Sequence, residues 1–191
     1  QTLLRERGVN LTFSDNSDLR SRDGAALVIS SRAAPPTQRF QILYQLAFLT
    51  QDDLLEATLD LARFQTDTAR AIAKVGLANY FAGAALMPYR AFLAATVETR
   101  HDLERLADRF GASIEQVAHR LSTLQRPGLK GIPFFFVRVD QAGTITKRHS
   151  ATRLQFARFG GACPLWNVYE AFAQPGRVLT WGLLGPGKGI E

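Results

Sequence analysis

Apolar side chains recur three and four residues apart over residues 39–50, a spacing that places them on one face of an α-helix. Pro35 and Pro36 come just before this stretch and Thr37 is a suitable N-cap, so we expect the helix to begin near residue 37. The predicted apolar face consists of Phe40, Leu43, Tyr44, Ala47 and Phe48.

Around this helix the pattern predicts a small sheet and several further helices. Val9, Leu11 and Phe13 alternate with polar residues, and residues 25–30 form a short apolar run, so both stretches are expected to pair as strands beside the helix. The polar residues 14–24 between them are expected to form an exposed loop. Helices are predicted over residues 1–7, 52–64, 67–86, 89–99 and, as a pair, 101–125.

The pattern changes at Arg126-Pro127-Gly128, which ends the helical part of the chain. Residues 132–139 and 144–147 are typical of two strands joined as a hairpin. We therefore predict an α+β fold, with a mainly helical domain and its small sheet over residues 1–125 and a smaller strand-rich domain over residues 126–191. The last elements expected are strands over residues 152–156 and 177–183 and a helix over residues 165–173.

Positive charge is concentrated in the last third of the chain. Residues 1–119 hold 13 Lys and Arg against 14 Asp and Glu, a net charge of −1, whereas residues 120–191 hold 10 against 3, a net charge of +7. Such an asymmetry indicates an anionic partner, which could be nucleic acid, a membrane surface or a phosphorylated ligand. The alternative is a basic face that only contacts water.

Other features limit the class of protein. No apolar run is long enough to cross a bilayer, and the first ten residues lack the apolar core of a signal peptide. The single cysteine, Cys163, excludes an internal disulfide framework. These features together predict a cytoplasmic protein.

The helix over residues 39–50 can be compared with the H-E-x-x-H helix of zinc proteases, in which two His bind the metal and the Glu activates water. In that frame the chain reads Tyr44-Gln45-Leu46-Ala47-Phe48. Neither imidazole is present, and the Gln45 amide cannot act as a carboxylate base. Many amphipathic helices fit such a frame, so the comparison needs a second stretch.

That stretch is residues 77–89, LANYFAGAALMPY, which resembles the E-A-N-x-F-A-x-x-L-L-M-P segment of the ImmA/IrrE peptidase family. The resemblance implies a third zinc ligand just ahead of Ala78-Asn79, where this chain has Val75, Gly76 and Leu77. We therefore expect a peptidase-derived fold with no catalytic residue and no metal. The degenerate metal positions are Tyr44, Gln45, Phe48 and Val75.

Two helices around residues 110–113 allow two interpretations. The pattern over residues 103–121 is similar to a helix-turn-helix, whose second helix would enter a DNA groove with Glu115, Gln116 and His119. The other interpretation is a helical hairpin that closes the core. We favour the hairpin, because a helix that reads bases needs more exposed polar side chains than these.

Another resemblance rests on Arg39-Phe40-Gln41 and on residues 79–88, 119–128, 133–136 and 156–167. These motifs resemble the short-chain fatty-acyl-CoA regulators of the XRE family, a group of bacterial transcription factors that includes the RamB-type regulators. The resemblance implies an effector-sensing domain that binds short-chain acyl-CoA as a ligand and not as a cofactor, and that controls acetate or propionate metabolism. It also implies a homodimer and promoter DNA bound through an N-terminal domain that we expect to be missing here.

Acyl-CoA requires cations for its phosphates, an aromatic face for adenine and an apolar lining for the acyl chain. Strand alternation places Phe135 and Val137 opposite Phe136 and Arg138, so only one of these sets can line a pocket. The predicted ligand-binding residues are Phe135, Arg138, Lys147, Arg148, Arg153, Arg158, Phe159, Gly160, Gly161, Cys163 and Trp166.

Cys163 is more consistent with a small thiol packed beside Trp166 than with a nucleophile, which would need a base such as His149. We predict no enzyme activity. The alternatives are a zinc- or cysteine-dependent hydrolase of the ImmA/IrrE type, and direct binding of nucleic acid by the basic last third.

Overall fold

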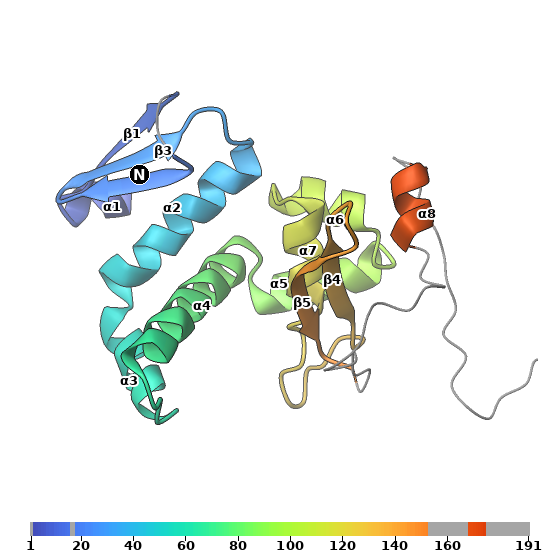
Figure 1. Ribbon diagram of the computed structural model, residues 1–191. Helices are drawn as coiled ribbons and strands as arrows, with labels where there is room; N and C mark the ends of the chain where they lie inside the picture. Colours follow the sequence, from blue (N-terminus) through green and yellow to red (C-terminus); the bar gives the residue numbers. More distant parts are fainter. Residues whose placement is uncertain (1, 16–17, 153–167, 175–191) are drawn as a thin grey trace, which may run out of the picture. The chain divides into compact units, whose positions relative to one another are not determined.

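The computed structural model describes residues 2–15, 18–152 and 168–174 (Figure 1). Contacts between residues divide the chain into two compact units, Gln1–Ile132 and Pro133–Glu191. Helices and strands are both present in the chain, which confirms the α+β class. The domain boundary after residue 125 stays a prediction. In the described part of the chain, no helix has the length and apolar character needed to cross a membrane.

The first unit begins with α1 (Thr2–Glu6) and a mixed sheet of β1 (Asn10–Ser14), β2 (Arg20–Asp23) and β3 (Ala26–Ser30). The strand order is β1-β3-β2, with β1 parallel and β2 antiparallel to β3. The predicted pairing of the two apolar strands is confirmed. The predicted loop over residues 14–24 is wrong in part, because its polar end forms β2. The backbone of β3 supplies the hydrogen bonds of this strand, so β2 needs no apolar alternation.

The central helix, α2 (Pro35–Thr50), has two apolar faces where the sequence pattern predicted one. One face packs on the sheet, because Ile42, Leu46 and Leu49 contact the core formed by α1 and the strands. Helix α2 is therefore buried from two sides, which explains why a single apolar stripe describes it incompletely. The residues of that core are Leu4, Val9, Leu27 and Ile29.

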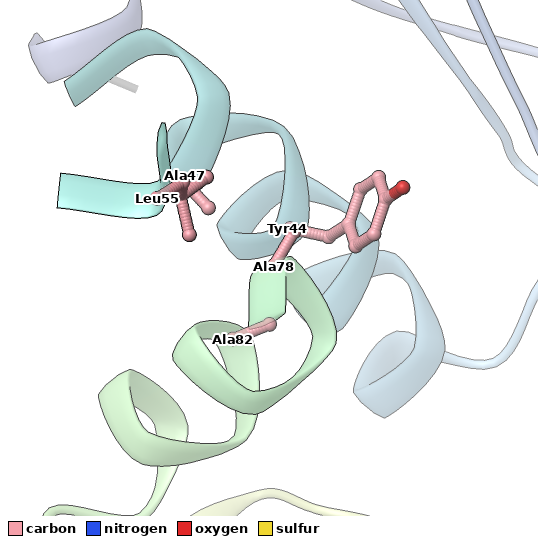
Figure 2. Packing of buried hydrophobic residues seen from close by; sticks show 5 residues of the cluster. All are labelled: Tyr44, Ala47, Leu55, Ala78 and Ala82. Atoms are coloured by element: carbon pink, nitrogen blue, oxygen red, sulfur yellow. The ribbon is translucent and has the colours of Figure 1, made fainter. Parts of the chain in front are cut away.

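The other face of α2 packs on α3 (Asp52–Asp60) and α4 (Asp67–Leu86). Figure 2 shows this second core, in which Tyr44 and Ala47 meet Ala78 and Ala82 of α4 and Leu55 of α3. The small alanine side chains allow α2 and α4 to approach closely. All five residues of the predicted apolar face belong to this core or pack against it.

The unit continues with α5 (Tyr89–Glu98), α6 (Leu103–Phe110) and α7 (Ile114–Leu121). Helix α6 ends at Gly111, whose φ of 59° is the left-handed conformation that glycine adopts without strain. Ser113 then caps α7 in a capping box with Gln116. The buried Phe92 ring of α5 meets Phe110 edge to face, with ring centroids 5.2 Å apart.

The second unit contains a hairpin of β4 (Phe135–Val139) and β5 (Ile145–Ser150), followed by α8 (Val168–Ala173). The predicted hairpin is confirmed, although β4 begins later and β5 ends later than expected. Helix α8 lies within the predicted range 165–173. Thr152 is not in a strand, and the rest of the strands predicted over residues 152–156 and 177–183 lies outside the described residues.

Candidate functional site

The zinc-protease frame lies on the face of α2 that packs against α3 and α4. Tyr44 and Phe48, at the two histidine positions, contact each other edge to face with ring centroids 5.1 Å apart. Gln45, at the position of the catalytic glutamate, is buried. Edge-to-face aromatic contacts stabilise a core, and this pair accounts for both positions by packing alone.

Cations lie beside both rings. The Arg20 guanidinium of β2 lies 3.9 Å from the centre of the Tyr44 ring, and its Nη1 donates a hydrogen bond of 2.9 Å to Gln41 Oε1. Lys74 Nζ of α4 lies 5.8 Å from the centre of the Phe48 ring. Tyr44 and Phe48 offer neither an imidazole nor a carboxylate at these two positions, so the residues present do not fit a zinc ion bound as in the H-E-x-x-H helix.

The residues predicted to replace the third ligand of the frame lie on α4. Leu77 is partly buried and packs against the core that contains Tyr44, whereas Val75 is 45% exposed. The predicted position Val75 is thus turned further toward solvent than Leu77. The described residues contain no group of three or more His, Cys, Asp and Glu side chains that could hold a metal ion.

Charged residues join α3 to α4 beside this core. Lys74 Nζ lies 2.7 Å from Asp52 Oδ1 and 2.5 Å from Glu56 Oε1, and Arg70 pairs with Glu56 and Asp60. Hydrogen bonds from Lys74 and then from Arg70 lower the pKa of Glu56 below its ordinary value. This network fixes Lys74, and therefore the cation beside Phe48, in place.

The helical hairpin of α6 and α7 uses its polar residues to build the fold. The Gln116 side chain accepts a hydrogen bond from Ser113 N and donates one to the Pro36 carbonyl at the start of α2. Arg120 is buried, and its Nε donates a hydrogen bond of 3.0 Å to the Met87 carbonyl. Sequence reasoning missed Arg120. Its only local signal is its position next to the apolar stripe of α7.

In the second unit, the described members of the predicted ligand site divide between the two faces of the hairpin. Arg138 and Lys147 are cross-strand partners, so their side chains share one face. Phe136 and His149 are the neighbouring pair on that same face. The Lys147 ammonium lies 5.9 Å from the centre of the Phe136 ring.

The other face of the hairpin carries the remaining two predicted residues that the structure describes. Arg148 pairs with Val137, and Phe135, which is 43% exposed, points to the same side of the ladder. One face of the hairpin therefore cannot present all four residues to one ligand. The other predicted residues lie outside the described part: Arg153, Arg158, Phe159, Gly160, Gly161, Cys163 and Trp166.

Comparison with known families divides the chain into two matched parts. Residues 6–122 match the family model described as the IrrE N-terminal-like domain. Residues 123–183 match the model described as the C-terminal region of the short-chain fatty acyl coenzyme A regulator. A solved structure of a Mycobacterium tuberculosis transcriptional regulator is similar as well, with a TM-score of 0.85, 46% identity and coverage of 92% of this chain and 55% of that chain.

Curated relatives carry regulator names. The chain is 77% identical over 179 residues to a propionyl-CoA carboxylase regulator of Cereibacter sphaeroides, which covers 94% of this chain and 39% of the relative. It is 47% identical over 183 residues to the HTH-type transcriptional regulator PrpR of Mycobacterium tuberculosis. This match covers 93% of this chain and 38% of that relative. It is 50% identical over 154 residues to the HTH-type transcriptional regulator RamB of Mycobacterium tuberculosis. This match covers 81% of this chain and 32% of that relative.

The chain thus spans less than two fifths of the length of these curated relatives. The family matches confirm both resemblances found in the sequence motifs. The chain belongs to the family with the IrrE N-terminal-like domain, and its last third carries the C-terminal region of the short-chain fatty acyl coenzyme A regulators.

Proposed function

We propose that the chain is the effector-sensing part of a bacterial transcription regulator and that it binds a short-chain acyl-CoA. The observation that carries the proposal is the face of the β4–β5 hairpin that holds Phe136, Arg138, Lys147 and His149. This face, called the cationic face below, lies within the residues that match the acyl-CoA regulator model. The name of the Cereibacter sphaeroides relative supports a link to propionyl-CoA metabolism.

The chemistry of the cationic face suits the phosphates of coenzyme A. Side chains of directly opposed residues stand about 5 Å apart at Cβ, so Arg138 and Lys147 can contact one phosphate group together. Arg138 Nε donates a hydrogen bond of 2.9 Å to Thr146 Oγ1, which orients the guanidinium. The Phe136 ring beside Lys147 offers a surface on which adenine can stack.

The rest of the predicted ligand site remains part of this proposal. Arg153, Arg158 and the aromatic residues Phe159 and Trp166 would add cations and apolar lining, and Gly160-Gly161 would let backbone N–H groups approach a phosphate. Cys163 would pack as a small thiol in the same segment. Phe135 and Arg148 point away from the cationic face, so we assign them no contact with the same phosphate.

We also propose that the IrrE-like part has lost the peptidase reaction. Tyr44, Gln45 and Phe48 replace the two imidazoles and the carboxylate, and Leu77, which packs against the same core, is a better counterpart of the third ligand than Val75. The regulator names of the relatives agree with a protein that is not an enzyme. Activity of the chain as a zinc-dependent peptidase would contradict this proposal.

The test of ligand binding is a thermal-shift series with acetyl-, propionyl- and butyryl-CoA, free CoA and pyrophosphate. A ligand that binds only the folded state stabilises it by about 2.7 kcal/mol at a hundred times its Kd. We expect stabilisation that depends on acyl length. An equal shift with every anion would mean that only phosphate is attracted, and no shift with any CoA would overturn the proposal.

Variants locate the site. Arg138→Gln combined with Lys147→Gln should weaken the response to every CoA ligand, because both cations of the cationic face are lost. Arg148→Gln is the matched control, since it removes one cation from the opposite face of the same hairpin. An equal loss of response in the control would place the ligand elsewhere.

Promoter DNA and a homodimer stay proposals as well. The names of the Mycobacterium tuberculosis relatives include "HTH-type transcriptional regulator", and we propose that parts of such a regulator outside the matched residues bind DNA. A second candidate function is nucleic-acid binding by the hairpin itself, because every residue of β5 is exposed and three successive residues, Lys147, Arg148 and His149, are basic or titratable. Tight, salt-dependent DNA binding by this chain alone would favour it.

A further inference from the structure

The last ten residues of the first unit are anchored for most of their length. Residues 123–132, called the strap below, follow α7 and end at the unit boundary after Ile132. Pro127, Gly128 and Gly131 give the strap the composition of a flexible linker. In the structure it nevertheless packs against α5.

Backbone packing holds both ends of the strap. Leu124 is 1% exposed, and its carbonyl accepts a hydrogen bond of 2.9 Å from Gly131 N, which closes the strap into a loop. A Cβ atom at Gly131 would lie 3.1 Å from Leu124 Cβ and 3.3 Å from Leu93 Cδ1 of α5. The strap therefore approaches α5 too closely for any residue larger than glycine at this position to fit without displacement.

The side chain of Tyr89 forms hydrogen bonds with the middle of the strap. The Tyr89 hydroxyl, at the start of α5, accepts a hydrogen bond of 2.9 Å from Arg126 N and donates one of 2.8 Å to the Leu129 carbonyl. The Arg126 guanidinium lies 4.6 Å from the centre of the same ring. A single side chain thus binds the backbone on both sides of Pro127-Gly128.

Arg120 connects the beginning of the strap to the residue before α5. Its guanidinium donates to the Met87 carbonyl just before α5 and to Thr123 Oγ1 at the start of the strap, and it lies 5.8 Å from the centre of the Tyr89 ring. The Tyr89 ring therefore lies near two guanidinium groups, those of Arg120 and Arg126.

We infer that Tyr89 is a positioning residue that latches the middle of the strap, from Arg126 to Leu129, onto α5. Loss of its hydroxyl should let this part of the strap leave the first unit more often, while buried Leu124 continues to hold the beginning of the strap. The inference does not depend on acyl-CoA binding.

Limited digestion with trypsin tests the latch in the absence of any ligand. The strap contains one good trypsin site, Lys130–Gly131, because the bond after Arg126 precedes proline. Cleavage at Lys130 requires the strap to leave the first unit locally. Tyr89→Phe removes only the hydroxyl and should accelerate cleavage at Lys130 by about tenfold, the change expected for loss of a pair of hydrogen bonds, with cleavage at other sites unchanged.

Tyr80→Phe is the matched control. Tyr80 lies 5.7 Å from the same Arg120 guanidinium but is 49% exposed on α4, and its variant should cleave like the wild type. Equal rates at Lys130 in the wild type and in Tyr89→Phe would overturn the inference. Acceleration at every site in the chain would overturn it too, because that outcome means global destabilisation.

Discussion

The Arg20 guanidinium covers the Tyr44 ring at 3.9 Å, so a cation from a surface strand lies against the first histidine position of the zinc-protease frame. The same side chain is held by Gln41, one turn earlier on α2. Arg20 thus joins β2 to the central helix from the side, at a place where backbone hydrogen bonds do not connect the sheet and the helix.

Replacing Arg20 should weaken this connection. A cation over an aromatic ring contributes about 0.5–1 kcal/mol when exposed and about 2 kcal/mol when desolvated, so Arg20→Ala should lower the free energy of unfolding by about 1 kcal/mol. Arg20→Lys should restore part of it. Arg22→Ala is the control on the same strand, because the Arg22 side chain donates locally, to the Gly24 carbonyl. Urea titrations of the three variants decide the matter; an unchanged Arg20→Ala midpoint would show that the stacking contributes nothing.

Arg120 should be among the most sensitive polar positions of the first unit. Arg120→Ala removes a buried donor and leaves the Met87 carbonyl unsatisfied, which should cost about 2–4 kcal/mol when the lost packing of the long side chain is included. Arg109→Ala is the comparison, because Arg109 pairs with Glu98 at the surface, and exposed pairs contribute about 0.2–1 kcal/mol. Thermal unfolding of both variants should rank them in this order. A similar loss in the two would contradict the structural role of Arg120.

The α3–α4 network should give stability that depends on pH. The pKa of Glu56 is lowered from 4.5 in the folded protein, chiefly by Lys74 and then by Arg70. A carboxylate with a lowered pKa stabilises the fold above its unfolded pKa, and this contribution is lost as pH falls through the folded pKa. Glu56→Gln should therefore be less stable than the wild type at pH 7, and the difference should vanish in acid well below pH 4.5.

Denaturant midpoints at pH 7 and pH 3 measure this difference. The same substitution in a Lys74→Met background should show a smaller pH-dependent effect, because the largest cause of the lowered pKa is gone. An effect of Glu56→Gln that is the same at both pH values would contradict the electrostatic explanation.

Replacement of two glycines by alanine should change the stability of the protein in opposite directions. Gly76 lies inside α4 and a Cβ there meets no atom within 4 Å, so Gly76→Ala should stabilise the protein by about 0.5–1 kcal/mol through helix propensity. Gly111 has a φ of 59°, and its Cβ would lie 2.0 Å from Arg39 Nη1. Gly111→Ala should therefore destabilise by about 1 kcal/mol or more.

The melting temperatures of the two variants show directly whether each substitution stabilises or destabilises the protein. A loss of stability in Gly76→Ala would contradict the open space that surrounds this position. A neutral Gly111→Ala would mean that the α6–α7 turn can adopt another conformation.

Much of the fold could be predicted where local sequence determines local structure. Helix α4 has the bounds predicted, because Thr66 caps its start and Pro88 prevents its continuation. Strand β2 could not be predicted, since its residues are polar and only the backbone of β3 makes them a strand. The second apolar face of α2 was hidden for a related reason: a helix that is buried from two sides shows no single stripe.

The candidate site was predictable only in part. Alternation along β4 separates Phe135 from Arg138, but which residues of β5 join each of them depends on the register across residues 140–144, and short-range pattern does not give that register. The burial of Arg120 and the strap held by Tyr89 depend on contacts between distant residues. In sequence, the strap looks like a break between domains because proline and glycine mark turns whether or not those turns are packed.

The strand order also has a consequence for how the protein folds. β1 and β2 each pair only with β3, the last of the three strands in the chain, so neither has its backbone partner until Ala26–Ser30 is available. The next element along the chain, α2, supplies the apolar side chains that cover this sheet. Residues 26–50 therefore form the local unit on which the amino-terminal segments assemble, and we expect β1 and β2 to acquire protection from hydrogen exchange only after β3 has docked on α2.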